Sequence, residues 1–322
     1  MTLVLHDRHL TTGAEFGEVN GSDCVEDFGD VSGEFTCLGE SAALLDLSFR
    51  GRLCVTGADR VEFLHGQVTN NVKALAQGGG CYAAIVDHKG KIQSDLNIYR
   101  LKDELLLDFE PGMTERVTER LENFIIAEDV ELIDVAPHYG LLSVQGPKSE
   151  EAIEKAGLVS EIPTADRRFV SLKGDELGEA YLMRRPRVSG AGFDVFVPNE
   201  KLEIAWVALQ RGVDAVGGCP VGRRALEAAR IEAGVPRYGV DMDETNLAPE
   251  TGIGDEAISY NKGCYIGQEV IARIRTYGRV SKSLRQLRFV GDPSGLSIED
   301  GLLYDGDRKV GNITSAVRLP TT

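Results

Sequence analysis

The sequence lacks the features that mark a membrane protein or a disulfide-stabilised secreted protein. No run of apolar residues approaches the roughly 18–20 that a helix needs to cross a bilayer. Residues 1–10 carry charges and histidines where a signal peptide would have an apolar core. The six cysteines are too few and too scattered among 322 residues for a disulfide scaffold. We therefore expect a cytoplasmic globular protein with no membrane partner.

Sequence motifs for metals and nucleotides are missing as well. The cysteines form no C-x-x-C pair and have no histidine pair nearby, so no metal site is predicted. No P-loop, G-x-G-x-x-G, H-E-x-x-H or G-x-S-x-G motif stands out. Phosphate-loop, zinc-protease and serine-hydrolase functions therefore have no support in the sequence.

Positive charge is scarce, because the net charge of the chain is −16. We expect no nucleic-acid partner on this ground, since nucleic-acid binding needs a basic surface. Residues 262–288 are the exception and carry a net charge of +6. A basic segment in an acidic chain is a candidate anion site. The alternative is a solvated face that balances an acidic neighbour.

The pattern of apolar residues predicts an α+β fold with antiparallel sheets and helices in two halves. We predict strands at 52–56, 81–86, 91–100, 105–109, 141–145, 169–173, 180–184 and 193–197, and helices at 59–66, 115–127, 147–157, 199–212 and 221–233. The length of the chain is enough for two or three such units.

The division into domains follows from this pattern. Residues 1–43 are rich in Gly, Asp and Glu, and we expect loops and short elements that pack on the core. Residues 44–135 form the first half and residues 136–279 the second. Residues 280–322 form a small β unit, with strands at 284–290, 302–304 and 310–319 and no obvious closing strand.

The predicted strand 91–100 has a clean period of two. Gln93, Asp95, Asn97 and Tyr99 take one face, opposite Ile92 and its apolar partners. Because aspartate is depleted in strands, Asp95 in mid-strand indicates a ligand or water nearby. The alternative is a hydrogen-bonded carboxylate at a strand bulge.

A second candidate site lies in residues 261–279, which hold Cys264 between two glycines, followed by Gln268 and Glu269. The neighbouring lysine and arginines would lower the pKa of the thiol and favour a reactive thiolate. The alternative is a buried cysteine in an ordinary turn before a solvated basic helix, since buried free cysteines are common.

Four stretches also carry motifs in a fixed order, at 53–72 (L-C-V-T-G-A-D-R-V-E-F-L-H-G-Q-V-T-N-N-V), 90–99, 142–147 (L-S-V-Q-G-P) and 230–239 (R-I-E-A-G, then Y-G). Together they resemble the folate-binding superfamily that joins the glycine-cleavage T-protein, an aminomethyltransferase, to the YgfZ group of iron–sulfur maintenance proteins. The stretch K-G-C-Y-I-G-Q-E at 262–269 resembles the signature of the YgfZ group.

The chain departs from both groups. T-proteins have a Y-T-G-E segment where this chain has residues 188–194, V-S-G-A-G-F-D, so the tyrosine and the first glutamate are missing. Asp95, in contrast, matches the aspartate that T-proteins use in folate chemistry.

The resemblance implies two intertwined halves around a central cavity, followed by a small β-barrel-like unit. It also implies tetrahydrofolate or a one-carbon derivative as the cofactor. Carboxylates and amides suit the pterin edge of a folate, aromatic residues suit its rings, and Arg or Lys suit its glutamate tail. We expect Asp95 and Cys264 to be catalytic. The expected cofactor-binding residues are Asn70, Tyr82, Asp95, Arg230, Tyr238 and Gln268.

The resemblance implies one main function and leaves two others open. The main one is a tetrahydrofolate-binding protein of the YgfZ type that supports iron–sulfur cluster assembly or repair, with iron–sulfur client proteins as partners. The alternative is a folate-dependent aminomethyltransferase that acts on a lipoyl carrier protein. The third is a non-catalytic interaction module that kept the fold and lost the ligand.

Overall fold

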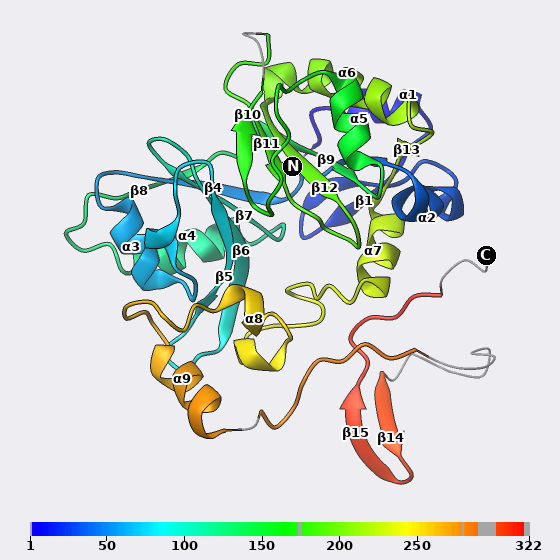
Figure 1. The fold of residues 1–322 in the computed structure, drawn as a ribbon. Coiled ribbons are helices and arrows are strands. Elements are labelled where there is room, and N and C mark those ends of the chain that lie inside the picture. The colour runs from blue at the N-terminus through cyan, green and yellow to red at the C-terminus, as the bar shows by residue number, and fades with distance from the viewer. Residues whose placement is uncertain (1, 173–175, 279, 289–300, 319–322) are drawn as a thin grey trace.

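The computed structural model describes residues 2–172, 176–278, 280–288 and 301–318 (Figure 1). The helices are α1 (His6–Thr11), α2 (Val31–Glu40), α3 (Arg60–Gln67), α4 (Thr114–Glu122), α5 (Ser149–Ala156), α6 (Leu202–Asp214), α7 (Arg223–Glu232), α8 (Gly254–Ala257) and α9 (Gln268–Tyr277), with single 3-10 turns at Val72–Ala74, Asn199–Lys201 and Ala248–Glu250. The strands are β1 (Glu15–Val19), β2 (Ser22–Asp27), β3 (Ala43–Asp46), β4 (Gly51–Thr56), β5 (Gly80–Val86), β6 (Ile92–Arg100), β7 (Leu105–Phe109), β8 (Glu131–Asp134), β9 (Tyr139–Gln145), β10 (Phe169–Ser171), β11 (Tyr181–Arg184), β12 (Gly192–Pro198), β13 (Cys219–Pro220), β14 (Leu302–Asp305) and β15 (Arg308–Asn312).

The first half of the chain forms a five-stranded antiparallel sheet in the order β5-β6-β7-β4-β8. One face of this sheet packs on α3 and α4 through apolar residues such as Leu53, Leu64 and Val117. The strands predicted at 52–56, 81–86, 91–100 and 105–109 are confirmed to within one residue at each end. Alternating apolar side chains made β6 readable from the sequence, and short apolar runs made the other three strands readable.

The second half forms a six-stranded sheet in the order β10-β11-β12-β9-β3-β13, covered by α5 and α6. All pairs are antiparallel except β3 with β13. Because β3 precedes the whole first sheet in the chain, the two halves are intertwined, and the boundary expected at 43/44 falls inside β3.

The two sheets face each other across a shared core. On β4 and β7, Leu53 and Leu107 point to the helices while Cys54 and Leu106 point to the second sheet. On β3, Leu44 likewise packs on α5 and α6, whereas Ala43 and Leu45 join the core between the sheets. The result is four layers, helix–sheet–sheet–helix (Figure 1).

Residues 1–43 are more regular than the sequence predicts. They form α1, a hairpin of β1 and β2, and the ten-residue helix α2. The hairpin turns at Asn20-Gly21, where both residues have positive φ, as a tight hairpin turn requires. The side chain of Asp30 caps α2 by accepting from the backbone N–H of Gly33 at 3.0 Å.

Further predictions need correction. Helix α4 ends at Glu122 instead of residue 127, and Phe124 is left outside the helix with its ring against the Arg120 guanidinium. Helix α6 continues two residues past the predicted end at Gly212. Within the described part of residues 280–322, β14 and β15 form a two-stranded sheet, and no closed barrel is present. Two short strands leave both edges of this sheet open. Residues 284–288 of the predicted strand 284–290 are irregular, and residues 289 and 290 lie outside the described ranges.

None of the helices in the described ranges is long and apolar enough to span a membrane.

Candidate folate site on strands β5 and β6

Tyr82 and Asp95 meet on neighbouring strands. The phenol of Tyr82 on β5 donates a hydrogen bond of 2.6 Å to Oδ2 of Asp95 on β6. The other carboxylate oxygen, Oδ1, is buried and has no hydrogen-bond partner among the described residues. A buried carboxylate oxygen without a donor is costly, so this atom is available for a ligand N–H.

The environment shifts the pKa of both groups upward. Burial, helped by the charge of Glu110, raises the pKa of Asp95 to about 6, and the Tyr82 hydrogen bond opposes this shift. Burial, followed by the charge of Asp95, raises the pKa of Tyr82 well above its usual range. Asp95 can therefore gain or lose a proton close to neutral pH, while Tyr82 stays a hydrogen-bond donor.

Tyr238 and Asn70 complete this site. Tyr238 is 5% exposed and packs in the same apolar cluster as Tyr82. Its buried hydroxyl has no hydrogen-bond partner in the part of the chain that the structure describes. Asn70 donates from Nδ2 to the carbonyls of Tyr82 at 2.7 Å and Glu256 at 2.8 Å. The structure thus brings four of the predicted residues together. Both amide hydrogens of Asn70 are used to hold β5 against α8.

A buried ion network adjoins Asp95 on β6. Asn97, two residues along β6, donates to Asp108 at 3.2 Å and accepts from Arg167 at 3.0 Å. Arg187 donates to Asp108 at 3.2 Å and to Asp194 on β12 at 2.7 Å. Burial alone would raise the pKa of Asp108, but the charges of Arg50 and Arg187 outweigh it and hold that pKa below its usual range.

Gln93 does not share the Asp95 face, contrary to the period-two prediction. The pairing of β5 with β6 shifts register here, from Ile85 opposite Ser94 to Val86 opposite Ile92. Gln93 is the extra residue of this bulge, and its side chain accepts a 2.7 Å hydrogen bond from Arg120 on α4. A bulge depends on the partner strand, so a single-strand pattern could not show it.

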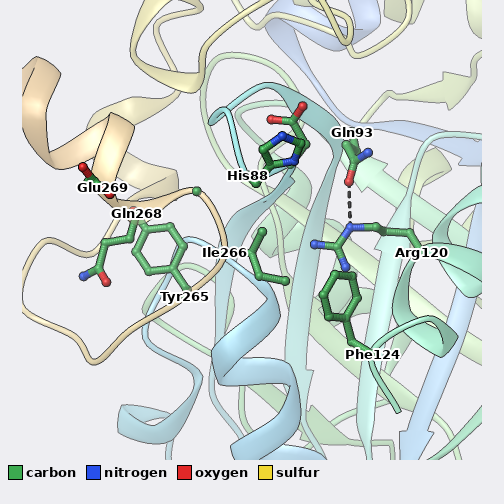
Figure 2. Close-up of a pocket in the computed structure, with 10 residues that line it drawn as sticks. His88, Gln93, Arg120, Phe124, Tyr265, Ile266, Gln268 and Glu269 are labelled. Carbon is green, nitrogen blue, oxygen red and sulfur yellow. Dashed lines mark hydrogen bonds between the residues drawn. The ribbon is translucent and has the colours of Figure 1, made fainter. Parts of the chain in front are cut away.

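A cavity of about 640 Å³ lies beyond this bulge (Figure 2). It is lined by Asp87, His88, Gln93, Arg120, Phe124, Tyr265, Ile266, Gly267, Gln268 and Glu269. The predicted cofactor residue Gln268 lies here. Asp95, Tyr82 and Tyr238 are not among the lining residues, so Gln268 belongs to a different surface from the Asp95 site. A central cavity around Asp95 stays a prediction.

Residues 262–269, the signature segment, are held against α3 and the β5–β6 hairpin. Gly267 has φ +80°, and a Cβ there would lie 2.4 Å from the carbonyl oxygen of Asp87. Lys262 donates from Nζ to the carbonyls of His65 at 2.5 Å, Val68 at 2.6 Å and Asn70 at 2.9 Å. Burial lowers the pKa of this ammonium group to about 8.

Cys264 in the signature segment is exposed. All six cysteines lie in the described ranges, and the other five are buried or partly buried. The basic side chains expected to act on its thiol have other partners. Arg273 pairs with Glu269 at 2.9 Å, and the Arg275 guanidinium lies 3.9 Å from the Tyr260 ring centroid. Their contribution to thiol reactivity stays a prediction.

Arg230 lies apart from these residues, in a buried ion network on α7. It pairs with Glu227 and Asp241 and donates to Ser315 Oγ at 2.9 Å. The charges of its partners raise the pKa of Arg230 despite the opposing effect of burial. Arg230 thus has two carboxylate partners within the protein, and its expected contact with the cofactor stays a prediction.

Comparison with known proteins gives the family. Residues 5–262 match the GCVT N-terminal domain. The chain belongs to the GCVT family. A putative chloroplast transferase of Arabidopsis thaliana is 30% identical over 317 residues, which cover 96% of this chain and 70% of that protein. An aminomethyltransferase of Bacillus cytotoxicus is 29% identical over 328 residues, which cover 98% and 86%.

The fold of this GCVT-family chain agrees with that of a solved aminomethyltransferase structure. The glycine cleavage system aminomethyltransferase T of Bartonella henselae superposes with a TM-score of 0.76 at 21% identity, over 86% of this chain and 75% of that one. The mixed α and β architecture with antiparallel sheets is therefore shared. The resemblance to the GcvT-like folate-binding superfamily is confirmed at this level.

Several arginines of the candidate site and of the neighbouring cavity gave no signal in the sequence. They are Arg120, Arg167 and Arg187. Each donates a hydrogen bond to a residue at least seven positions away in the sequence, and most of these partners are more than 25 positions away. Arginines scattered through an acidic chain carry no local signal, so only the fold reveals these partners.

Proposed function

We propose that this protein binds a reduced folate at Asp95, Tyr82 and Tyr238 and acts as a folate-dependent aminomethyl or related one-carbon transferase. The observation that carries the proposal is the Oδ1 atom of Asp95, which is buried and has no donor within the described ranges, beside the phenol that fixes Oδ2. The names of relatives that align over nearly the whole chain support the reaction type.

The donors and acceptors of this site fit a reduced pterin. A pterin ring presents N–H donors to a carboxylate and acceptor atoms to a phenol, and Asp95 Oδ1 and the Tyr238 hydroxyl lack partners of these kinds. The aromatic rings of Tyr82 and Tyr238 supply flat apolar surface for the rest of the ring. A bound reduced folate supplies the nitrogen that accepts the one-carbon unit.

Asp95 has two tasks in this proposal. Its Oδ1 atom orients the ligand by accepting an N–H hydrogen bond, while Tyr82 keeps the carboxylate from rotating. With a pKa of about 6, the same carboxyl takes up or releases the proton that accompanies transfer. Asn70 acts as a positioning residue, because it fixes the backbone of Tyr82.

Iron–sulfur cluster maintenance of the YgfZ type is the second candidate, and Cys264 favours it. An exposed thiol on a segment anchored by Lys262 is accessible to a partner protein, unlike the thiols of Cys24, Cys54 and Cys81. The stretch 188–194, which lacks the Y-T-G-E of T-proteins, also favours it. In this role folate binding continues and turnover is not required.

The first test uses calorimetry to measure the binding of tetrahydrofolate to three proteins. These are the wild type, Asp95→Asn and the matched control Asp103→Asn. Asp103 is exposed and lies in the β6–β7 turn, so its change leaves the site intact. We expect binding at least tenfold weaker for Asp95→Asn alone, because a charge-assisted hydrogen bond is lost. No binding to the wild type would overturn both candidate functions.

The second test separates the two functions. The aminomethyl-loaded lipoyl carrier protein is added with tetrahydrofolate, and ammonia release is measured. Release that needs Asp95 and is unchanged in Cys264→Ser supports the transferase. Folate binding without release, together with loss of an iron–sulfur enzyme activity in cells that carry only Cys264→Ser, supports the maintenance role. Cys37→Ser is the control for the cellular assay.

A further inference from the structure

The cavity of about 640 Å³ between α4, the β5–β6 turn and the signature segment is unexplained by the proposed function. Its lining includes none of Asp95, Tyr82 and Tyr238. Two segments far apart in the sequence build it, residues 87–93 and 265–269, with the end of α4 as the third wall (Figure 2).

Arg120 is the charged group of this cavity. Its guanidinium donates to Gln93 Oε1 at 2.7 Å, Gln67 Oε1 at 3.0 Å and the Val86 carbonyl at 3.2 Å. All three acceptors are neutral. A guanidinium has five N–H donors, so two remain without a partner among the described residues.

Neither carboxylate of the cavity lining neutralises Arg120. Asp87 Oδ1 accepts the backbone N–H groups of Lys89 and Lys91, both at 2.8 Å, and Glu269 pairs with Arg273 at 2.9 Å. Burial lowers the pKa of Arg120, and the more distant charge of Asp87 opposes this only in part. Since only neutral groups contact this half-buried guanidinium among the described residues, it can also bind an anion.

The rest of the lining supplies flat apolar surface. The Phe124 ring lies 4.3 Å from the Arg120 guanidinium and is 41% exposed. Tyr265 and Ile266 lie on the facing wall, and Figure 2 shows the guanidinium between Gln93 and Phe124, directed toward Ile266. His88 and the Gln268 amide add polar groups at the same cavity.

We propose that this cavity is a second binding site, separate from the Asp95 site, for a small organic anion with a flat apolar body, of the aromatic carboxylate class. Arg120 binds the carboxylate through its two free N–H groups. Phe124, Tyr265 and Ile266 contact the ring. The signature segment thus contributes a wall to a ligand site in addition to presenting Cys264.

The test uses 4-fluorobenzoate as the probe and fluorine NMR as the readout, with the neutral isostere 4-fluorobenzamide beside it. We expect 4-fluorobenzoate to bind with a dissociation constant on the order of 1 mM, as a fragment of this size does, and the amide to bind about tenfold more weakly. No binding of the acid, or equal binding of the amide, would overturn the proposal.

Three variants locate the probe. Arg120→Gln and Phe124→Ala should each weaken 4-fluorobenzoate binding, Arg120→Gln about tenfold. Phe124 lies after the helix end and is partly exposed, so its truncation tests the site without disturbing the core. Arg116→Gln is the matched control, because it removes the same charge from the same helix and Arg116 does not line the cavity. If Arg116→Gln weakens 4-fluorobenzoate binding equally, the change in net charge alone explains the effect, and the proposed role of Arg120 is wrong.

Saturating tetrahydrofolate decides whether the two sites are separate. If it leaves the probe signal unchanged in a protein that binds the folate, the sites are independent. If it displaces the probe, the cavity is part of the folate site and the proposal of a second site is wrong. If tetrahydrofolate does not bind at all, the proposed function fails while the variant series still tests this cavity.

Discussion

Arg187 joins the two sheets by donating to Asp108 on β7 and to Asp194 on β12. The two carboxylates belong to different sheets, and both are fully buried. This single guanidinium therefore fixes the relative placement of the two halves next to Asn97 and the Asp95 strand.

Arg187→Met should destabilise the protein by about 3–5 kcal/mol, because two buried carboxylates lose their shared cation. Urea unfolding at pH 7 measures the change. Arg8→Met serves as the control, since Arg8 forms an exposed pair with Glu203 that contributes less than about 1 kcal/mol. A loss below about 1 kcal/mol in Arg187→Met would contradict the role of Arg187 as the link between the sheets.

The second prediction concerns pH and Asp95→Asn. The pKa of Asp95 is about 6 in the folded protein, above the value of 3.8 for a free side chain. Between about pH 4 and 6 the native state binds more protons than the unfolded state, so this group lowers stability as pH rises, and the cost persists above pH 6. The variant removes that cost and keeps an oxygen that accepts from Tyr82.

Asp95→Asn should therefore be more stable than the wild type by about 1–3 kcal/mol at pH 8, with the difference vanishing near pH 3. Urea unfolding of both proteins across this pH range gives the difference directly. If the two proteins differ by the same free energy of unfolding at every pH, the pKa of Asp95 is not raised by folding. The variant is then a more stable protein with a weaker ligand site.

The third prediction concerns Lys262, whose ammonium group holds the signature segment to three carbonyls at the end of α3. Lys262→Met should leave the sheets folded and speed amide hydrogen exchange in residues 262–269 and 65–70 by at least tenfold. Lys73→Met is the control, since Lys73 pairs with Glu62 at the surface. Unchanged exchange in both segments would mean that packing of Tyr265 is enough to hold the segment.

The fourth prediction is an order of thiol reactivity. Cys264 is exposed, whereas burial raises the pKa of Cys24 to about 11 and that of Cys81 to about 12. Iodoacetamide added to the native protein at pH 7.5 should label Cys264 first and leave Cys24, Cys54 and Cys81 unlabelled until unfolding. Peptide mass spectrometry measures each site. Early labelling of Cys54 or Cys81 would show that the first sheet opens locally.

The sequence by itself determined eight of the eleven strands of the two sheets, because short apolar runs and alternation of apolar side chains are local properties of the chain. The strands β3, β8 and β13, which are two to four residues long, were not predicted. The sequence also marked Asp95, since a carboxylate in the middle of an apolar strand conflicts with strand propensity. The motif at 262–269 marked Cys264 in the same way. Each of these signals lies within about ten consecutive residues.

Only the tertiary structure decided which side chains meet. The bulge that turns Gln93 toward Arg120 depends on how β5 pairs with β6. The bond from Lys262 to Val68 joins residues 194 positions apart, and β3 crosses from the first half into the second sheet. Such contacts form when the whole chain is compact, and no short stretch of sequence specifies the partner. The separation of the Asp95 site from the Arg120 cavity therefore became visible only in the fold.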